Sequence, residues 1–149
     1  MRAVVQRVSR ARVTVDGKLI GEIGAGLMVL LGVTHADDDK DADYLVDKIV
    51  NMRIFDDADG KMNLSLVDID GGLLVVSQFT LYGDTRRGRR PSFIEASPGS
   101  EALRWYKYFV AKAREIVKDV ATGEFGAMMD VELVNDGPVT IILDSEKTI

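Results

Sequence analysis

The sequence of 149 residues contains no cysteine and a single histidine. The absence of cysteine excludes a disulfide framework, a thiolate zinc site and a thiol nucleophile, and it fits a reducing compartment. His35 is expected to be a loop residue without a catalytic role, because no serine or aspartate in a recognisable motif accompanies it. A G-x-S-x-G motif, a P-loop and a dinucleotide-binding glycine motif are also missing. Nothing in the sequence requires a metal or an organic cofactor, so we expect neither.

Long apolar segments are absent too. The longest apolar stretch, residues 26–33, is less than half the length needed to cross a bilayer. Near the N-terminus only three consecutive apolar residues lie between two arginines, too few for the core of a signal peptide. We therefore expect a cytoplasmic protein with no membrane role. The chain length indicates one domain over residues 1–149.

Charge is distributed unevenly along the chain. The net charge of −5 argues against a protein that binds nucleic acid over its whole surface. Two basic clusters are nevertheless present, one in the segment RRGRR and one near the N-terminus. Each is either a set of solvated arginines that balance nearby acids or a local phosphate-binding patch. The members are Arg86, Arg87, Arg89 and Arg90 in the first cluster, and Arg2, Arg7, Arg10 and Arg12 in the second.

Alternation of apolar and polar residues predicts several strands. Residues 11–23 alternate around Asp16-Gly17, a dipeptide typical of a two-residue hairpin turn, and residues 3–8 form a possible earlier strand. Residues 26–33 are apolar on both faces, which indicates a central strand covered on both sides. Residues 72–82 predict a second buried strand that becomes polar at Ser77-Gln78.

Two long helices are predicted. Apolar residues at helical spacing indicate a first helix over residues 38–52. Ser97-Pro98 is typical of a helix start, with Ser97 as the N-cap. The apolar stripe that follows predicts a second helix of about five turns, as far as Val120.

The C-terminal region predicts a hairpin. Residues 128–134 and 139–144 both alternate, and Gly137-Pro138 lies in the turn between them. Residues 56–72 have turn chemistry throughout and are expected to be a long connection. The predicted fold class is therefore α+β, with a strongly curved, mostly antiparallel, barrel-like sheet and two long helices packed outside it.

Two segments place unusual residues where a strand should be apolar. In VVSQFTLY, Ser77, Gln78 and Thr80 interrupt a buried run, and buried polar groups need partners or a function. In NDGPVT, Gly137 and Pro138 are residues that strands avoid. Local backbone hydrogen bonds would explain the first segment, and an ordinary hairpin turn the second. The alternative for the second is a rigid turn that presents backbone carbonyls to a ligand, because glycine leaves room for close approach.

Taken together, the two segments resemble the signature motifs of the D-aminoacyl-tRNA deacylases, also called D-tyrosyl-tRNA deacylases. The resemblance covers nearly the whole chain, from MRAVVQRVSRARVTVDG through SQFTLYGDTRRGRRPSF to FGAMMDVELVNDGPVTIILDS. One departure is Arg89, which stands where a small polar residue is expected in the pattern R-x-G-x-R-P. This departure bears on the strength of tRNA contact and not on the chemistry.

The resemblance implies an enzyme that removes D-amino acids, and glycine, mistakenly esterified to the 3′ end of tRNA. It also implies a homodimer in which Gly137 and Pro138 of one subunit, joined by a cis peptide bond, reach the active site of the other. Their carbonyl oxygens would hold the α-amino group of the substrate. A D side chain would then point into open space, whereas an L side chain would collide with the site.

For SQFT we add a mechanistic hypothesis to this resemblance. Backbone N–H groups of Phe79 and Thr80 would form an oxyanion hole, while Ser77 and Gln78 would orient the terminal ribose. The attacking group is either Thr80 or a water molecule positioned by the ribose 2′-OH of the substrate. We favour water, because no histidine or lysine in the motif activates the threonine.

The pattern FGAxM matches residues 125–129. Phe125 and Met129 would wall the pocket for the terminal adenine, and plain core packing is the alternative. Two other classes of function stay open: a non-catalytic RNA-binding module that uses Phe93 to hold a single-stranded end, and a small-ester hydrolase that shares only the fold. The candidates for contact with the tRNA backbone are Arg86, Arg87, Arg89 and Arg90.

Overall fold

The computed structural model describes residues 1–149. Its sheet is organised around β1 (Arg2–Val15), which pairs with three other strands. One edge of β1 pairs antiparallel with β2 (Lys18–Ile23) and β3 (Gly26–Gly32) in succession. The other edge pairs antiparallel with β8 (Asp130–Asp144). Three strands therefore depend on β1 for their position.

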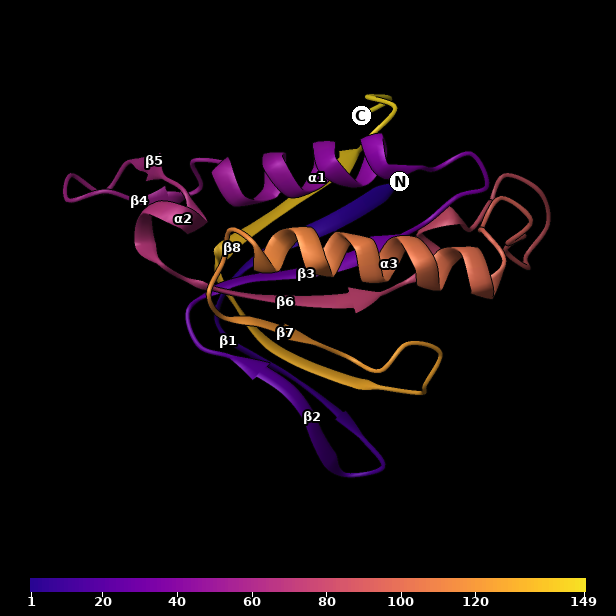
Figure 1. Cartoon of the computed structure of the whole chain (residues 1–149), viewed down its shortest axis with the longest axis horizontal. Helices are drawn as coiled ribbons and strands as arrows, with labels where there is room; N and C mark the ends of the chain where they lie inside the picture. The colour runs from indigo at the N-terminus through magenta and orange to yellow at the C-terminus, as the bar shows by residue number, and fades with distance from the viewer.

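The sheet curls until its end strands meet. β6 (Gly72–Ser77) and β7 (Val120–Thr122) continue it from β3 as parallel strands, which gives the order β2-β1-β3-β6-β7 with β8 on the other edge of β1 (Figure 1). A Cβ at Gly21 on β2 would overlap the carbonyl oxygen of Thr122 on β7. The result is a nearly closed barrel, so the predicted curved, barrel-like sheet is confirmed.

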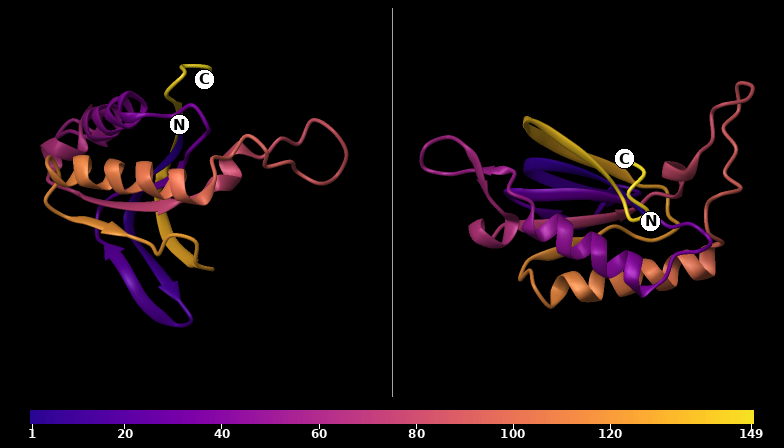
Figure 2. Two further views of the ribbon diagram at one scale, coloured as in Figure 1. Left: turned by 45° about the vertical axis from the view of Figure 1, so that its right-hand side comes forward. Right: turned by 90° about the horizontal axis from the view of Figure 1, so that it is seen from above.

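Two helices, α1 (Asp39–Asn51) and α3 (Gly99–Arg114), lie side by side across one face of the sheet (Figure 2). α1 begins in a capping box formed by the side chains of Asp38 and Asp41. Apolar residues from both helices join those of β1, β3 and β6 in a core of 24 buried residues, in which Phe109 is the largest fully buried side chain. The predicted packing of two long helices outside the sheet is confirmed.

A second, smaller core fills the inside of the barrel. Successive residues of a strand face opposite sides, so Leu27 and Leu73 belong to the core under the helices, while Met28 and Leu74 face the interior. β3 and β6 are thus covered on both faces, which explains their continuous apolar runs. The interior core comprises Val8, Ala11, Val13, Ile23, Met28, Leu74 and Val76.

Several local predictions are confirmed. The first hairpin turns at Asp16-Gly17, whose φ angles of 49° and 77° are those that a type I′ turn requires. The strand predicted over residues 26–33 is β3, and the helix predicted over residues 38–52 is α1. The possible strand over residues 3–8 and the first hairpin strand are one continuous element, because β3 and β2 pair with successive halves of β1.

The second buried strand is shorter than predicted. β6 ends at Ser77, and the predicted continuation is a 3₁₀ helix, η1 (Phe79–Tyr82). The N–H of Gln78 donates to the carbonyl oxygen of Leu31 at 2.8 Å, and the carbonyl oxygen of Gln78 accepts from the N–H of Leu81 at 3.3 Å. Because β3 ends at Gly32, the chain beyond Gln78 has no partner strand and turns.

The prediction of a second helix as far as Val120 is wrong in its extent. Pro98, not Ser97, is the N-cap residue of α3, and the helix ends at Arg114. Val120 lies in β7, opposite Leu73 of β6. Strand pairing with β6 outweighs the helical pattern of the sequence at this point, as tertiary contacts often do.

The predicted C-terminal hairpin is also wrong. Residues 128–134 and 139–144 do not pair with each other, because β1 is long enough to pair with both. Val8 stands opposite Asn135 while Gln6 stands opposite Thr140, so four residues of β8 face Arg7 alone. Residues 136–139 therefore form a bulge in a single strand. We call residues 135–140 the β8 bulge.

Two connections have structure that the sequence did not reveal. Residues 56–72 contain most of a small hairpin of β4 (Phe55–Asp56) and β5 (Met62–Leu64), followed by the short helix α2 (Leu66–Ile69). The segment between η1 and α3 projects away from the body of the protein (Figure 2). Both lie outside the main sheet.

Close approach of β3 and β6 provides a test of the fold. Gly26 and Gly72 face each other in register, and a Cβ at Gly26 would overlap the backbone of Gly72. We expect Gly26→Ala to lower the free energy of unfolding by about 3 kcal/mol, because the strands must separate. Urea denaturation measures this change. In Gly24→Ala, where a Cβ meets nothing within 4 Å, the change should be below about 1 kcal/mol; equal losses in both variants would contradict the argument.

Candidate active site

One pocket lies at the C-terminal end of β6, between the first turn of α3 and the segment that precedes β8. Its volume is about 460 Å³. Ser77, Gln78 and Phe79 line it from the end of β6, and Phe125 and Met129 line it from the segment after β7. Five of the predicted site residues, far apart in the sequence, thus meet here. We call this the β6 pocket.

Thr80 belongs to the same group although it does not line the β6 pocket. Gln78 Nε2 donates a hydrogen bond to Thr80 Oγ1. Phe79 is 54% exposed and packs edge-on against Phe93, with ring centroids 5.2 Å apart. Phe79 and Thr80 are the first two residues of η1, and the first N–H groups of a helix have no intrahelical acceptor. Two backbone donors therefore lie at the edge of the pocket.

The wall of the β6 pocket is anchored by the core. The rings of Phe125 and Tyr106 meet edge-on at 5.8 Å. The Tyr106 hydroxyl donates to the carbonyl oxygen of Val75 at 2.7 Å, and burial raises the pKa of Tyr106 to about 12, so the donor keeps its proton at neutral pH. A Cβ at Gly123 would lie 2.7 Å from Met129 Sδ. Phe125 and Met129 thus pack against the core and also line the pocket.

The β8 bulge carries the second motif, and its Gly137-Pro138 peptide bond is cis. Asn135 spans the base of the bulge: Oδ1 accepts from the N–H of Val139 at 3.1 Å, and Nδ2 donates to Thr140 Oγ1 at 3.1 Å. Gly137 has a φ of 127°, and a Cβ there would lie 2.9 Å from a guanidinium nitrogen of Arg7. Backbone conformation and space both require glycine at this position.

Arg7 fills the space behind the β8 bulge and is only 7% exposed. Its Nε donates to the carbonyl oxygen of Asp136 at 3.1 Å, and its Nη1 donates to that of Ile54 at 2.8 Å. The carboxylates of Asp56 and Asp136 lie 3.6 Å from the guanidinium. Sequence reasoning grouped Arg7 with exposed arginines and missed this role. The available signal was its place in the inward-facing series Ala3, Val5, Arg7.

The β8 bulge and the β6 pocket lie far apart in one protomer. Arg7 stands in register with Leu27, and Leu27 with Leu73, four residues before Ser77. This corresponds to about 13 Å along the strands, and the bulge is also three strands away, roughly 14 Å across the sheet. The structure therefore does not bring Gly137 and Pro138 to the other predicted site residues of the same chain.

The predicted tRNA-contact arginines lie in the projecting segment between η1 and α3. Arg86 is engaged locally, because its Nη2 lies 2.8 Å from Asp84 Oδ2. This hydrogen bond lowers the pKa of Asp84 to about 2. Arg87, Arg89 and Arg90 are exposed and take part in no ion pair. Three cations of the cluster thus remain available to a ligand.

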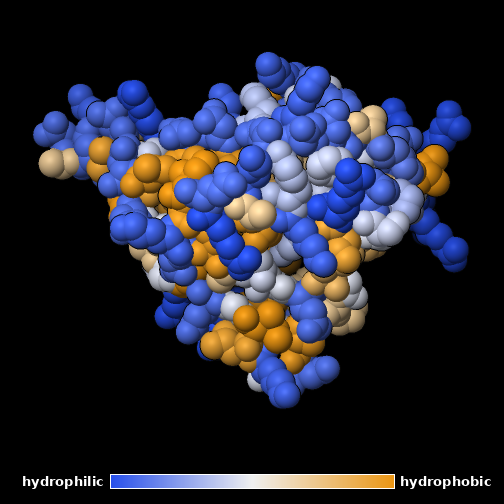
Figure 3. Space-filling model, viewed as in Figure 1, coloured by the Kyte–Doolittle hydropathy of each residue, from blue (hydrophilic) through white to orange (hydrophobic).

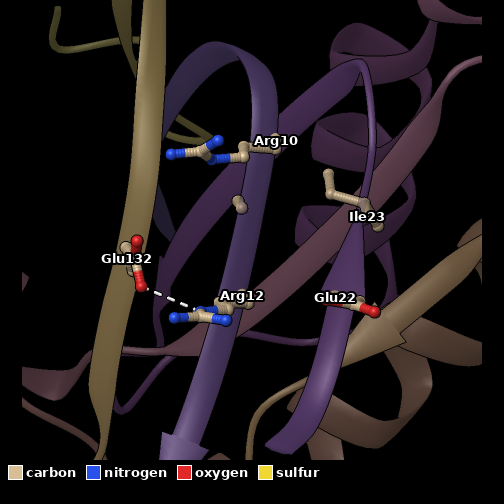
Figure 4. Close-up of a pocket in the computed structure, with 6 residues that line it drawn as sticks. Arg10, Arg12, Glu22, Ile23 and Glu132 are labelled. Carbon is tan, nitrogen blue, oxygen red and sulfur yellow. Dashed lines mark hydrogen bonds and ion pairs between the residues drawn. The ribbon is translucent and has the colours of Figure 1, made fainter.

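A hollow of about 350 Å³ on the outside of the β1–β2 hairpin contains part of the N-terminal basic cluster (Figure 4). Arg12 on β1 and Glu132 on β8 form an exposed ion pair at 2.8 Å. Glu22 on β2 lines the same hollow as Arg10. Acids therefore accompany Arg10 and Arg12, which favours the interpretation of solvated, balanced charges for these two arginines.

His35 is tied to the backbone, since its Nε2 donates to the carbonyl oxygen of Ile94 at 2.6 Å. None of the helices combines the length and the apolar character that a membrane span demands. No group of three or more His, Asp or Glu side chains is placed to hold a metal ion.

Comparison with known proteins decides the family. The sequence profile described as D-Tyr-tRNA(Tyr) deacylase matches residues 4–144. The curated D-aminoacyl-tRNA deacylase of Thermosipho melanesiensis is 62% identical over 148 residues, which is 99% of each chain. The chain belongs to the D-Tyr-tRNA(Tyr) deacylase family. As the resemblance predicted, it is an enzyme, a hydrolase of the D-aminoacyl-tRNA deacylase class.

Solved structures share the fold of this deacylase. A structure named c-Myc DNA Unwinding Element Binding Protein superposes with a TM-score of 0.92 at 44% identity, over 97% of this chain and 98% of that one. A probable eukaryotic D-amino acid tRNA deacylase superposes with a TM-score of 0.81 at 18% identity, over 95% and 97% of the two chains. Family membership favours an enzyme over the non-catalytic RNA-binding module.

The role of Arg7 in the deacylase is open to a direct test. Arg7→Gln should lower the free energy of unfolding by about 2 kcal/mol, because two carbonyl oxygens lose a charged donor. Arg12→Gln, on the same strand, removes only an exposed ion pair and should change it by less than about 1 kcal/mol. Chemical denaturation of both variants measures the difference. Similar losses would show that Arg7 does not support the β8 bulge.

Proposed function

We propose that this deacylase hydrolyses the ester bond between a D-amino acid and the 3′ end of tRNA, and so releases free D-amino acid and tRNA. One observation carries the proposal: the β6 pocket and the β8 bulge are each firmly built, but they lie at distant places in one chain. A complete site of both motifs then requires two copies. Aminoacylated tRNA as substrate assigns the enzyme to the cytoplasm and to proofreading of chirality in translation.

An apolar row on the sheet supports a homodimer. Val4 is the cross-strand neighbour of both Leu30 and Ile142, and Ile142 is 53% exposed. The flanking residues Ala3 and Val5 are fully buried in the core under the helices. Because successive residues of a strand face opposite sides, the row lies on the face of the sheet that the helices do not cover. In register, the row lies between Arg7 and the end of β3. A twofold contact along it would carry each bulge toward the pocket of the partner subunit.

The β8 bulge suits the recognition of handedness. Backbone carbonyl oxygens of Gly137 and Pro138 would accept hydrogen bonds from the substrate α-ammonium group and so fix the Cα. A D side chain, or the hydrogen of glycine, then points into open space, which extends the activity to Gly-tRNA. Main-chain acceptors would bind the α-ammonium group whatever the side chain of the substrate is. An enzyme that acts on many D-amino acids requires this property. Arg7 and Asn135 keep these acceptors in place.

The β6 pocket would hold the terminal adenosine and the scissile ester. Phe125 and Met129 form an apolar wall for the adenine, while Ser77 and Gln78 orient the ribose. The N–H groups of Phe79 and Thr80 would stabilise the oxyanion of the tetrahedral intermediate, where one such donor contributes about 3 kcal/mol. Contact of the tRNA backbone with Arg87, Arg89 and Arg90 would add a salt-dependent part to the affinity.

Water, positioned by the substrate 2′-OH, is the attacking group in this proposal. Thr80 Oγ1 accepts a hydrogen bond from Gln78, and no histidine or lysine in the motif is available to take its proton. An aminoacyl ester is already activated, so the enzyme does not need a full catalytic triad. Positioning and oxyanion stabilisation are then the main contributions of the protein.

Pro138→Ala tests the stereochemical part. Wild-type enzyme should hydrolyse D-Tyr-tRNA and Gly-tRNA and leave L-Tyr-tRNA intact. The variant should lose on the order of 100-fold on the first two, comparable to the loss of one preorganised polar contact, because alanine does not fix φ as proline does. Pro91→Ala, in the projecting segment, is the matched control and should stay near wild type. Unchanged activity of Pro138→Ala would remove the bulge from the mechanism.

Pro138→Ala, combined with Gln78→Ala, tests whether the site is shared between subunits. Gln78→Ala should impair the β6 pocket, and Pro138→Ala the bulge, of every homodimer. Refolding the two variants together creates mixed dimers in which one of the two sites has both intact parts. We expect recovery of about a quarter of the wild-type rate for random pairing of symmetric subunits. No recovery, or a fully active monomer in sedimentation, would contradict the cross-subunit arrangement.

Thr80→Ala separates the two attacking groups. If water attacks, single-turnover hydrolysis of D-Tyr-tRNA should fall by no more than about tenfold, the effect of one lost hydrogen bond of about 0.5–1.5 kcal/mol. If Thr80 is the nucleophile, hydrolysis should stop while tRNA binding is retained. Quenched-flow assays with saturating enzyme, together with filter binding, distinguish these outcomes.

A further inference from the structure

A second pocket shares a lining residue, Phe125, with the β6 pocket. It has a volume of about 520 Å³ and lies between α3 and the segment that follows β7. Phe125 lines both pockets, so they are neighbours that share one aromatic wall. We call this second site the α3 pocket. Nothing in the catalytic proposal uses it.

Two unpaired cations stand at the α3 pocket. Lys107 and Arg114 both line it, both are exposed, and neither takes part in an ion pair. They are seven residues apart on one helix, so they lie on the same face, about 10 Å from each other along the axis. The only acid in the lining is Glu124. The local excess of positive charge contrasts with the net charge of −5 of the whole chain.

Other basic residues of α3 are neutralised locally. Arg104 lies 3.9 Å from Glu101, and Lys112 lies 3.9 Å from Glu115. Arg104 also lies over the ring of Trp105, 4.6 Å from its centroid. The cations left without such partners on this helix are therefore the two that line the pocket. Figure 3 views the protein from the side on which α3 lies in front, and it shows hydrophilic side chains next to apolar patches there.

The inner part of the α3 pocket is apolar and aromatic. Leu103, Tyr106, Val110 and Phe125 line it, and the rings of Tyr106 and Phe125 are held edge-on by the core. A nucleotide has a flat base and an anionic phosphate, and single-stranded nucleic acid is bound by this combination of apolar or aromatic surface and cationic rim. An amino-acid side chain or a neutral small molecule would not account for the cations.

We propose that the α3 pocket binds the nucleotide that precedes the terminal adenosine in the single-stranded 3′ end of tRNA. Its base would rest on the apolar lining, and phosphates on either side of it would contact Lys107 and Arg114. The inference rests on the proposed function, in which the β6 pocket takes the terminal adenosine. Phe125 would then separate two successive bases of the 3′ end. The arginines of the projecting segment contribute no residue to this pocket.

The test compares the double variant Lys107→Gln/Arg114→Gln with the control Arg104→Gln/Lys112→Gln, which removes the same charge from the same helix. The probes are a fluorescent RNA trinucleotide CCA, followed by anisotropy as salt is varied, and unlabelled adenosine as a competitor. Each phosphate contact on a single strand adds about 0.7 to the slope of log affinity against log salt. Loss of two contacts should therefore make the slope shallower by about 1.4, a difference of about sevenfold between about 50 mM and about 200 mM salt.

Activity provides the second readout. D-aminoacyl-adenosine lacks the preceding nucleotides, whereas D-aminoacyl-CCA contains them. Lys107→Gln/Arg114→Gln should raise KM for D-aminoacyl-CCA, by about sevenfold more at about 50 mM than at about 200 mM salt, and leave hydrolysis of D-aminoacyl-adenosine unchanged. The control variant should match wild type on both substrates.

Three results would overturn the proposal: equal effects of the two double variants, an unchanged salt slope in Lys107→Gln/Arg114→Gln, or equal losses on both substrates. Failure of the proposed function looks different. Wild-type enzyme would then hydrolyse no D-aminoacyl ester, yet the CCA binding assay would still decide whether the α3 pocket holds the nucleotide.

Discussion

Arg7 is buried where β8 departs from β1, and the shape of the β8 bulge depends on that contact. A strand of 14 residues pairs with β8 on both sides of the bulge, so the two ends of the bulge are fixed by regular hydrogen bonds. Between them the guanidinium donates to two carbonyl oxygens, one of them in the bulge itself, and excludes any side chain at Gly137. An irregular segment is thereby held in place from both ends and from behind, as the proposed recognition of the substrate requires.

Strand order and register separate the two motifs of one chain. The β8 bulge faces Arg7 on β1, while the β6 pocket lies at the C-terminal end of β6, beside the first turn of α3. In the proposed homodimer, the β8 bulge of one subunit completes the β6 pocket of the other. The exposed Ile142, beside Val4 and Leu30, offers the apolar surface on which such a partner would be seated.

The composition and the net charge of the protein both bear on the proposed mechanism. The chain has no cysteine, and its one histidine is bonded to a carbonyl oxygen. In the proposed mechanism, main-chain groups therefore take the place of acid–base side chains. Its net acidity limits nonspecific binding of RNA, so unpaired cations are informative where they occur. Arg87, Arg89 and Arg90 form one such set, and Lys107 with Arg114 forms the other, next to the wall that Phe125 provides.

Local patterns in the sequence determined the hairpin at Asp16-Gly17, the buried strand β3, the helix α1 and the presence of the two motifs, because turn residues and apolar periodicity act over a few neighbours. Only the tertiary structure decided that Val120 is in a strand, that β6 stops at Ser77 and that residues 128–144 do not fold back on themselves. Each of these outcomes depends on which strand is available as a partner, and that information is distant in the chain. The buried role of Arg7 could not be predicted for the same reason. In the sequence it is one of four arginines near the N-terminus, and only the tertiary structure shows that it is buried behind the β8 bulge.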